Sequence, residues 1–299
     1  MDTRARLAAL LGPGFPGADF AGATRVGLRD HNGWLLEDLT FRAGAEDIPA
    51  FFLRPPDGHA PAPAILYCHA HGNDYTVGRD ELTLGRPALL RPFADDLMDL
   101  GCAVLTLDMP AFGARQSPPE ASRAKAHLWA GSTLFGQMLA ELRAGVSFLA
   151  GHPAIDRDRI GALGFSMGST HAFWLAALDP RIRATSALCS FADLAALIEA
   201  GGHDGHGIYM MVPGLTRAFS TGQIAGLAAP RALQIAVGLK DWSTPPAAFA
   251  RAKADLRAAY DAAGAGDRLR FQIEPDQGHV ETAAMRRAVL EFLRQELVS

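Results

Sequence analysis

Lysine is scarce in this 299-residue chain, in which only three of the 28 basic residues are lysines. The arginines that make up the rest are scattered along the sequence, and 32 acidic residues bring the formal net charge to −4. Proteins that bind nucleic acid or anionic membranes generally carry a basic face. The charge pattern therefore predicts neither nucleic acid nor a membrane as a partner.

Cysteine is scarce as well, because the chain has three, at Cys68, Cys102 and Cys189. They form neither a CxxC pair nor a metal-binding spacing, and an odd number without a framework is typical of a reducing compartment. No apolar run reaches the roughly 18 residues of a membrane span. The apolar stretch at residues 7–11 is also too short for a signal peptide. These absences predict a cytoplasmic protein.

Hydrophobic residues, in contrast, make up 49% of the chain, and charged residues only 20%, so a sizeable core is expected. Apolar runs of strand length alternate with helical patterns. The predicted strands are 34–41, 48–53, 64–68, 103–107, 160–165, 184–189, 232–237 and 269–273. The predicted helices are 88–100, 122–149, 169–178, 247–263 and 283–297.

This alternation predicts an α/β fold whose mostly parallel sheet is covered by helices on both faces. Ligands of such a sheet bind at the carboxyl ends of its strands. Residues 191–229 interrupt the alternation, and we interpret them as a small cap inserted over that edge. We expect an N-terminal leader over residues 1–30 and one domain over residues 31–299.

The sequence Gly164-Phe165-Ser166-Met167-Gly168 follows a predicted strand and begins a predicted helix. This pattern is typical of a nucleophile elbow, a strained turn that lifts the serine hydroxyl clear of the sheet. Without that context the same pattern occurs in ordinary turns, where the serine caps a helix. The context favours Ser166 as a nucleophile.

A serine nucleophile needs a base to take its proton and a carboxylate to orient that base. Asp241 and His279 follow the next suitable strands, in the chain order Ser, acid, His that this elbow predicts. Asp193, which follows an earlier strand, is the rival acid. The expected catalytic residues are therefore Ser166, Asp241 and His279.

An oxyanion formed at the attacked carbonyl needs backbone N–H donors. One should come from Met167, directly after the nucleophile, and the other from the loop after the strand at 64–68. In that loop we favour Asn73, with Gly72 as the alternative.

At these motifs the chain resembles the α/β-hydrolase superfamily over about residues 30–298, and within it the dienelactone hydrolase-like and acetyl xylan esterase-like bacterial serine esterases. The resemblance implies an eight-stranded sheet whose first strands are antiparallel, together with the same triad. Dienelactone hydrolases use a cysteine nucleophile, so Ser166 favours ordinary carboxylic esters. The stretches that carry the resemblance are 66–72, 108–113, 134–138, 164–168, 175–181 and 229–231.

Several other side chains have more than one interpretation. His69 with His71, and His203 with Asp204 and His206, have spacings that could suit a metal, but we predict no metal. Asp108 ends a strand, where we expect it to bind loop N–H groups. The residues expected to contact substrate are His71, Phe112, His206, Tyr209 and Met210. Trp129 and Trp174 are further candidates for an acyl pocket, and core packing would explain them equally.

Together these patterns predict a serine carboxylesterase that hydrolyses small esters with short acyl chains through an acyl-enzyme. The same triad could serve an acyltransferase or a cofactor-free perhydrolase, and a non-catalytic binding protein could share the fold. No Gly-Lys dipeptide of a P-loop is present, and no cofactor is expected. The expected partner is a small-molecule ester, and the sequence leaves open whether the chain forms a homo-oligomer.

Overall fold

The computed structural model describes residues 2–13, 15, 22–43 and 46–299. Parts of the predicted leader and of the turn after residue 43 lie outside these residues. The strands are β1 (Ala23–His31), β2 (Trp34–Ala43), β3 (Glu46–Arg54), β4 (Ala62–Cys68), β5 (Ala103–Leu107), β6 (Ile155–Phe165), β7 (Ile182–Leu188), β8 (Ala232–Gly238) and β9 (Leu269–Glu274).

The α-helices vary widely in length. They are α1 (Thr3–Leu10), α2 (Glu81–Leu84), α3 (Ala94–Asp99), α4 (Glu120–Trp129), α5 (Leu134–Gly151), α6 (Met167–Leu178), α7 (Leu194–Glu199), α8 (Leu215–Ala218), α9 (Thr221–Gly226), α10 (Pro246–Ala262) and α11 (Ala283–Leu293). Shorter helical segments are η1 (Gly113–Arg115), η2 (Gly202–Gly205), η3 (Ile208–Met210), η4 (Gly266–Arg268) and η5 (Arg294–Val298).

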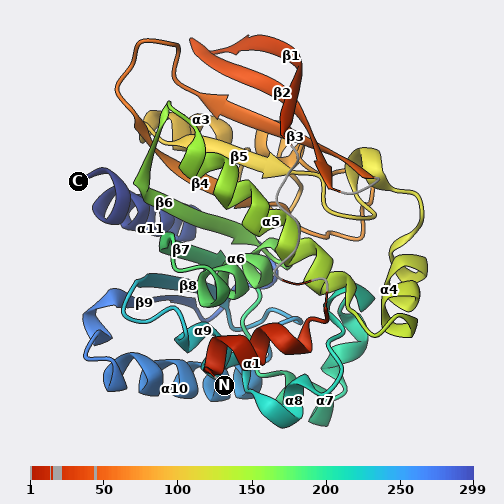
Figure 1. Cartoon of the computed structure of the whole chain (residues 1–299). Helices are drawn as coiled ribbons and strands as arrows, with labels where there is room; N and C mark the ends of the chain where they lie inside the picture. Colours follow the sequence, from red (N-terminus) through yellow and green to blue (C-terminus); the bar gives the residue numbers. More distant parts are fainter. Residues whose placement is uncertain (1, 14, 16–21, 44–45) are drawn as a thin grey trace.

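The strands form one sheet in the order β1-β2-β3-β5-β4-β6-β7-β8-β9. Strands β1, β2 and β3 are antiparallel, β3 is antiparallel to β5, and the strands from β5 to β9 are parallel. Helices lie on both faces, with α5 and α6 on one face and α3 and α11 on the other (Figure 1). The predicted α/β fold with a mostly parallel sheet is confirmed.

The described part of the chain adds β1 to the eight strands expected, giving nine. Seven of the nine residues of β1 are exposed and none is buried, because β1 is an edge strand. A strand with no buried face has no apolar alternation to detect, which explains why the sequence did not predict it.

Two predicted helices differ from the structure. Within 88–100 only α3 is helical, since Pro92 disfavours a helix through the residues before it. The helix predicted over 122–149 is two helices, α4 and α5. Gly131 adopts φ 73° between them, and the Thr133 hydroxyl accepts a hydrogen bond from Gly136 N at 2.9 Å to begin α5.

The segment predicted as a leader contains α1 and most of β1, and Leu7 and Leu11 are buried in the main core. Residues 191–229 hold α7, η2, η3, α8 and α9, between β7 and β8. The division into leader, domain and cap stays a prediction. None of the helices in the described ranges is both long and apolar enough to cross a membrane.

Candidate active site

The turn between β6 and α6 has the backbone strain of a nucleophile elbow. Ser166 adopts φ 58° and ψ −116°, a conformation that non-glycine residues rarely adopt. A Cβ on Gly164 would lie 2.2 Å from the backbone of Gly168, and one on Gly168 would lie 1.9 Å from the carbonyl oxygen of Cys68. These approaches explain why the sequence needs glycine at both positions.

His279 lies within hydrogen-bond distance of both Ser166 and Asp241. The distance from Ser166 Oγ to His279 Nε2 is 2.9 Å, and that from His279 Nδ1 to Asp241 Oδ2 is 2.8 Å. The tautomer that donates Nδ1–H to Asp241 leaves Nε2 free to accept the serine hydroxyl proton. The arrangement can therefore turn a hydroxyl into a nucleophile, as serine hydrolysis requires.

The carboxylate of Asp241 is held by its own loop. Asp241 is 2% exposed, and its Oδ1 accepts hydrogen bonds from Ser243 N at 2.8 Å and Ser243 Oγ at 2.7 Å. The hydroxyl of Ser243 also lies 3.2 Å from His279 Nδ1. Asp193, the rival acid, instead begins α7 by accepting a hydrogen bond from Ala196 N, and pairs with Arg251.

The donors expected for an oxyanion lie beside Ser166. Met167 is the first residue of α6, so its N–H has no acceptor within the helix. Asn73 N donates at 3.1 Å to Nδ1 of His71, so the favoured second donor is already engaged. Gly72 has φ 59°, and a Cβ there would lie 2.3 Å from Arg86 Nη1. The assignment of the second donor stays a prediction.

Glu120 connects this loop with the cap, and sequence analysis missed it. The Oε2 atom accepts hydrogen bonds from His71 Nε2 at 2.8 Å and Tyr75 OH at 2.6 Å, and Oε1 accepts one from Tyr209 N at 2.7 Å. Burial alone would raise the pKa of Glu120, but the hydrogen bonds from His71 and Tyr75 outweigh it and lower the pKa. Only its position after two prolines hinted that Glu120 begins a helix.

A hollow of about 280 Å³ opens above the elbow, and we call it the Ser166 hollow. Its lining includes three of the residues expected to contact substrate, His71, His206 and Tyr209, together with Trp242 and His279. The rings of Trp242 and His279 lie 5.6 Å apart. The hollow can thus hold a small ester next to the serine hydroxyl.

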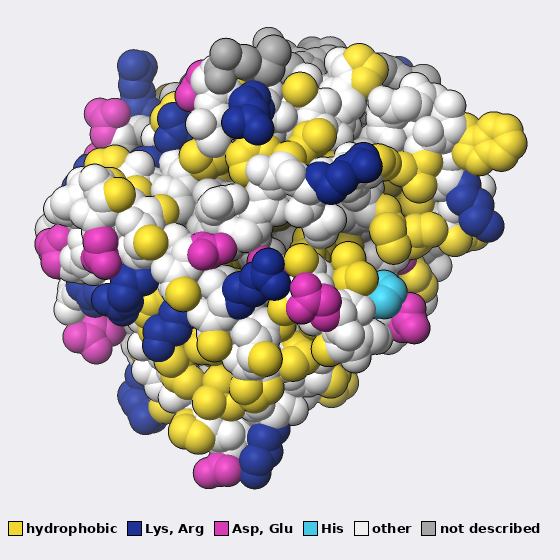
Figure 2. All heavy atoms as spheres, turned by 90° about the horizontal axis from the view of Figure 1, so that it is seen from below, with side chains coloured by type: hydrophobic (Ala, Val, Ile, Leu, Met, Phe, Trp, Pro, Cys, Tyr) yellow, Lys and Arg dark blue, Asp and Glu magenta, His cyan; other side chains and the backbone are white. Residues whose placement is uncertain are grey.

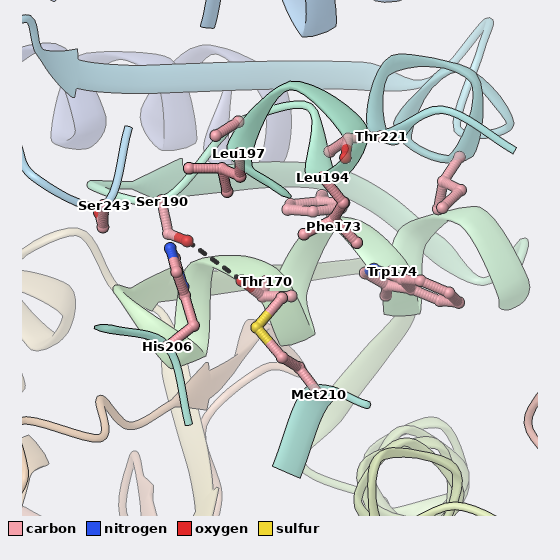
Figure 3. Close-up of a pocket in the computed structure, with 12 residues that line it drawn as sticks. Thr170, Phe173, Trp174, Ser190, Leu194, Leu197, His206, Met210, Thr221 and Ser243 are labelled. Atoms are coloured by element: carbon pink, nitrogen blue, oxygen red, sulfur yellow. Dashed lines mark hydrogen bonds between the residues drawn. The ribbon is translucent and has the colours of Figure 1, made fainter. Parts of the chain in front are cut away.

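The other residues expected to contact substrate lie elsewhere. Phe112 is fully buried and packs behind His71, with ring centroids 5.0 Å apart. Met210 lines a second, narrower hollow with Trp174, which Figure 3 draws. Trp129 is 92% exposed at the end of α4 and lines neither of these two hollows.

Of the histidine pairs considered for a metal, His69 and His71 bind other groups, whereas His203 Nδ1 and His206 Nε2 are buried without a hydrogen-bond partner among the described residues. His69 Nδ1 lies 2.9 Å from the carbonyl oxygen of Ala70, and its Nε2 accepts a hydrogen bond from Met109 N. His203 lies 3.5 Å from Asp204, which is largely exposed. The described residues contain no group of three or more potential ligands placed to hold a metal ion. Asp108 accepts hydrogen bonds from Arg79 N and Ala114 N, as expected of a loop-binding carboxylate.

Comparison with known proteins places this geometry in a family. Residues 29–198 match the family model described as "Esterase FrsA-like". The YtaP protein of Bacillus subtilis (strain 168), which carries the name of a hydrolase, is 37% identical over 264 residues, covering 88% of this chain and 87% of YtaP. The chain belongs to the FrsA-like esterase family. It is therefore a hydrolase of an esterase family, as the resemblance implied.

One further sequence relative and one structural neighbour of the FrsA-like chain carry the names of esterases. Esterase FrsA of Serratia proteamaculans (strain 568) is 33% identical over 159 residues, which cover 51% of this chain and 31% of that esterase. Acetyl xylan esterase 1 of Thermoanaerobacterium sp. JW/SL YS485 has a TM-score of 0.66 and 16% identity, covering 99% of this chain and 93% of that chain. The latter likeness confirms the α/β-hydrolase fold.

Proposed function

We propose that this FrsA-like protein is a serine carboxylesterase that hydrolyses small esters through an acyl-enzyme. The observation that carries the proposal is the continuous hydrogen-bonded series from Ser166 through His279 to Asp241, at 2.9 and 2.8 Å. Ser166 Oγ attacks the ester carbonyl as its proton passes to His279 Nε2, and the tetrahedral oxyanion faces the N–H of Met167. His279 then protonates the departing alcohol.

Hydrolysis of the acyl-enzyme uses the same groups in the reverse order. His279 Nε2 takes a proton from water, whose oxygen attacks the acyl carbonyl, and then returns that proton to Ser166 Oγ as the acid is released. Asp241 stays ionised and stabilises the imidazolium in both steps. The reaction needs no redox or group-carrying cofactor.

Short acyl chains are the preferred substrates in this proposal. The Ser166 hollow of about 280 Å³ suits a compact ester, and the fold neighbour named an acetyl xylan esterase is consistent with a small acyl group. His71, His206 and Tyr209 would contact the substrate because they line this hollow. The cytoplasmic location and the oligomeric state stay predictions.

Active-site labelling tests the proposal. A fluorophosphonate should add its mass to the peptide that contains Ser166, and Ser166→Ala should lose both the label and about 10⁶-fold in kcat. The control is Ser169→Ala, since Ser169 lies on the same helix and its hydroxyl binds the carbonyl oxygen of Ser190. Labelling elsewhere, or full ester hydrolysis by Ser166→Ala, would contradict the proposal.

A further inference from the structure

His206 lines three hollows that follow one another away from Ser166. The first is the Ser166 hollow, and the second, which we call the neck, has a volume of about 20 Å³. The third, which we call the cap hollow, has a volume of about 180 Å³ and lies among residues 194–216. The neck shares Ser190, His206 and Ser243 with the first hollow, and Leu194, Leu197, His206 and Met210 with the third.

The neck is narrow because side chains of the cap cross it. Its volume holds about one water molecule. Figure 3 shows His206 and Met210, which come from the cap, facing Ser190 and Thr170, while Leu194 and Leu197 lie above Ser190 and Thr170 in this view. A substrate group that passes from Ser166 through the neck into the cap hollow must displace a side chain such as that of Met210 or His206.

The two side chains are held to different degrees. His206 Nε2 is buried without a hydrogen-bond partner in the described part of the chain, but a backbone hydrogen bond with Ser243 and the Trp242 ring, whose centroid lies 5.4 Å away, restrain the imidazole. Burial lowers the pKa of His206, which favours the neutral ring. Met210 is unbranched and flexible, and methionine adapts readily to irregular gaps. Met210 is therefore the side chain that can widen the neck most easily.

The chemistry of the cap hollow is apolar and uncharged. Among the described residues its lining contains no aspartate, glutamate, lysine or arginine, and His203 and His206 are its titratable side chains. A buried charge without a partner is costly, so the hollow should reject charged groups. Its volume of about 180 Å³ exceeds the roughly 150 Å³ of an engineered apolar cavity that binds benzene.

The cap hollow reaches the surface. Ile198 and Met211, which line it, are 51% and 50% exposed, although large hydrophobic side chains are usually buried. In Figure 2, the face seen from below shows hydrophobic side chains gathered in patches between charged ones. An occupant that filled the hollow would cover part of this apolar surface.

We propose that the cap hollow is a second subsite, which holds an uncharged apolar group of about the size of a benzene ring from an ester whose carbonyl lies at Ser166. The inference rests on the proposed esterase function and extends it from small esters to esters with one bulkier apolar end. The apolar end can belong to the acyl part or to the alcohol part of the ester, because the ester carbonyl lies at Ser166 in either case. The experiment distinguishes these two cases.

The test fills the hollow from its exposed side. Ile198→Trp places a large ring in the cap hollow, whereas Glu199→Trp, the matched control, places the same ring at the next exposed position of α7, outside the lining. Acid release is measured from ethyl acetate, ethyl phenylacetate and benzyl acetate. For each variant, kcat/KM for each aromatic ester is divided by kcat/KM for ethyl acetate.

One of these ratios should fall about 10- to 200-fold in Ile198→Trp and stay at the wild-type value in Glu199→Trp. A fall for ethyl phenylacetate assigns the hollow to the acyl part, and a fall for benzyl acetate assigns it to the alcohol part. If Ile198→Trp leaves both ratios within about twofold of those of Glu199→Trp, the subsite proposal is overturned.

Calorimetric binding separates this outcome from failure of the esterase proposal. The Ser166→Ala variant should bind one of the two aromatic esters with a lower Kd than ethyl acetate. In the double variant Ser166→Ala, Ile198→Trp, this difference in Kd should disappear. If the wild-type chain hydrolyses none of the three esters but this binding pattern holds, only the esterase proposal fails. If Ser166→Ala binds the three esters equally, the cap hollow is not a subsite.

Discussion

The loops at the strand ends and the cap hold their polar groups in different ways. The loop residues are fixed by backbone hydrogen bonds to neighbouring strands and loops, such as Ser166 N to Leu188 O at 2.8 Å and Lys240 N to Gln277 O at 2.8 Å. In the cap, η2 and η3 are single short turns among glycines, and Tyr209 N is held at 2.7 Å by the carboxylate of Glu120. Rigid loops suit bond-making chemistry, which depends on precise geometry, and an adaptable cap suits selection among substrates.

The most direct test of this contrast replaces one carboxylate by an amide in each of the two regions, in separate variants. Asp241→Asn should lower kcat by about 10⁴, because an amide no longer holds the histidine in the tautomer that accepts the serine proton. Asp193→Asn should cost at most about 1 kcal/mol of stability, because asparagine also begins helices well and mainly the ion pair with the half-exposed Arg251 is lost. Steady-state kinetics gives kcat for both variants, and chemical denaturation gives their free energies of unfolding. If Asp193→Asn instead shows the large loss of kcat, Asp193 is the acid that orients His279.

Within the cap, truncation should change preference rather than chemistry. Tyr209 lines the Ser166 hollow and Met210 lines the neck, so Tyr209→Ala and Met210→Ala should alter the relative kcat/KM for different acyl lengths by about 10- to 200-fold. Fluorophosphonate labelling of Ser166 should persist in both. Equal losses for every ester would show that these residues act on the chemical step instead.

Glu120 joins the two regions, so a change there should affect both. Glu120→Gln replaces one acceptor by a donor, which leaves the N–H of Tyr209 or of His71 without its partner. A buried unsatisfied group costs about 1 to 3 kcal/mol, which lowers the rate by about 5- to 150-fold if the transition state carries the whole cost. We expect a lower kcat with a smaller change in KM.

A matched variant separates positioning from folding in that experiment. Tyr75→Phe removes one hydrogen bond to Glu120 but leaves those from His71 and Tyr209, so its kcat should fall less than that of Glu120→Gln. If Glu120→Gln lowers the unfolding temperature but leaves kcat unchanged, the carboxylate stabilises the fold without positioning the loop.

The smallest expected effect is that of a chelator. His203 and Asp204 lie 3.5 Å apart, and Asp204 is 90% exposed, a poor arrangement for a structural ion. Incubation with EDTA should therefore leave kcat/KM unchanged in the parent protein and in His203→Ala. Loss of activity with EDTA that zinc restores would make the 203–206 loop a metal site.

Much of the framework was predictable because buried parallel strands are continuous apolar runs that end in polar residues. The strand predicted at 103–107 matches β5 as Ala103–Leu107, and the predicted order Ser166, Asp241, His279 corresponds to side chains in hydrogen-bond contact. The helix boundaries were less predictable. Pro92 and Gly131 each interrupt a helix at a single residue, whereas the apolar periodicity that predicts the helices continues past both residues.

The sequence by itself determined the fold class, the elbow glycines and the residues proposed for the triad, since each depends on neighbours in the chain or on the strand that precedes it. Only the tertiary structure decided that Glu120 meets His71 and Tyr209, which lie 49 and 89 residues away. It alone decided that β1 joins the sheet edge and that three hollows meet at His206. Such contacts arise from the packing of segments distant in sequence, and no local pattern of residues records them.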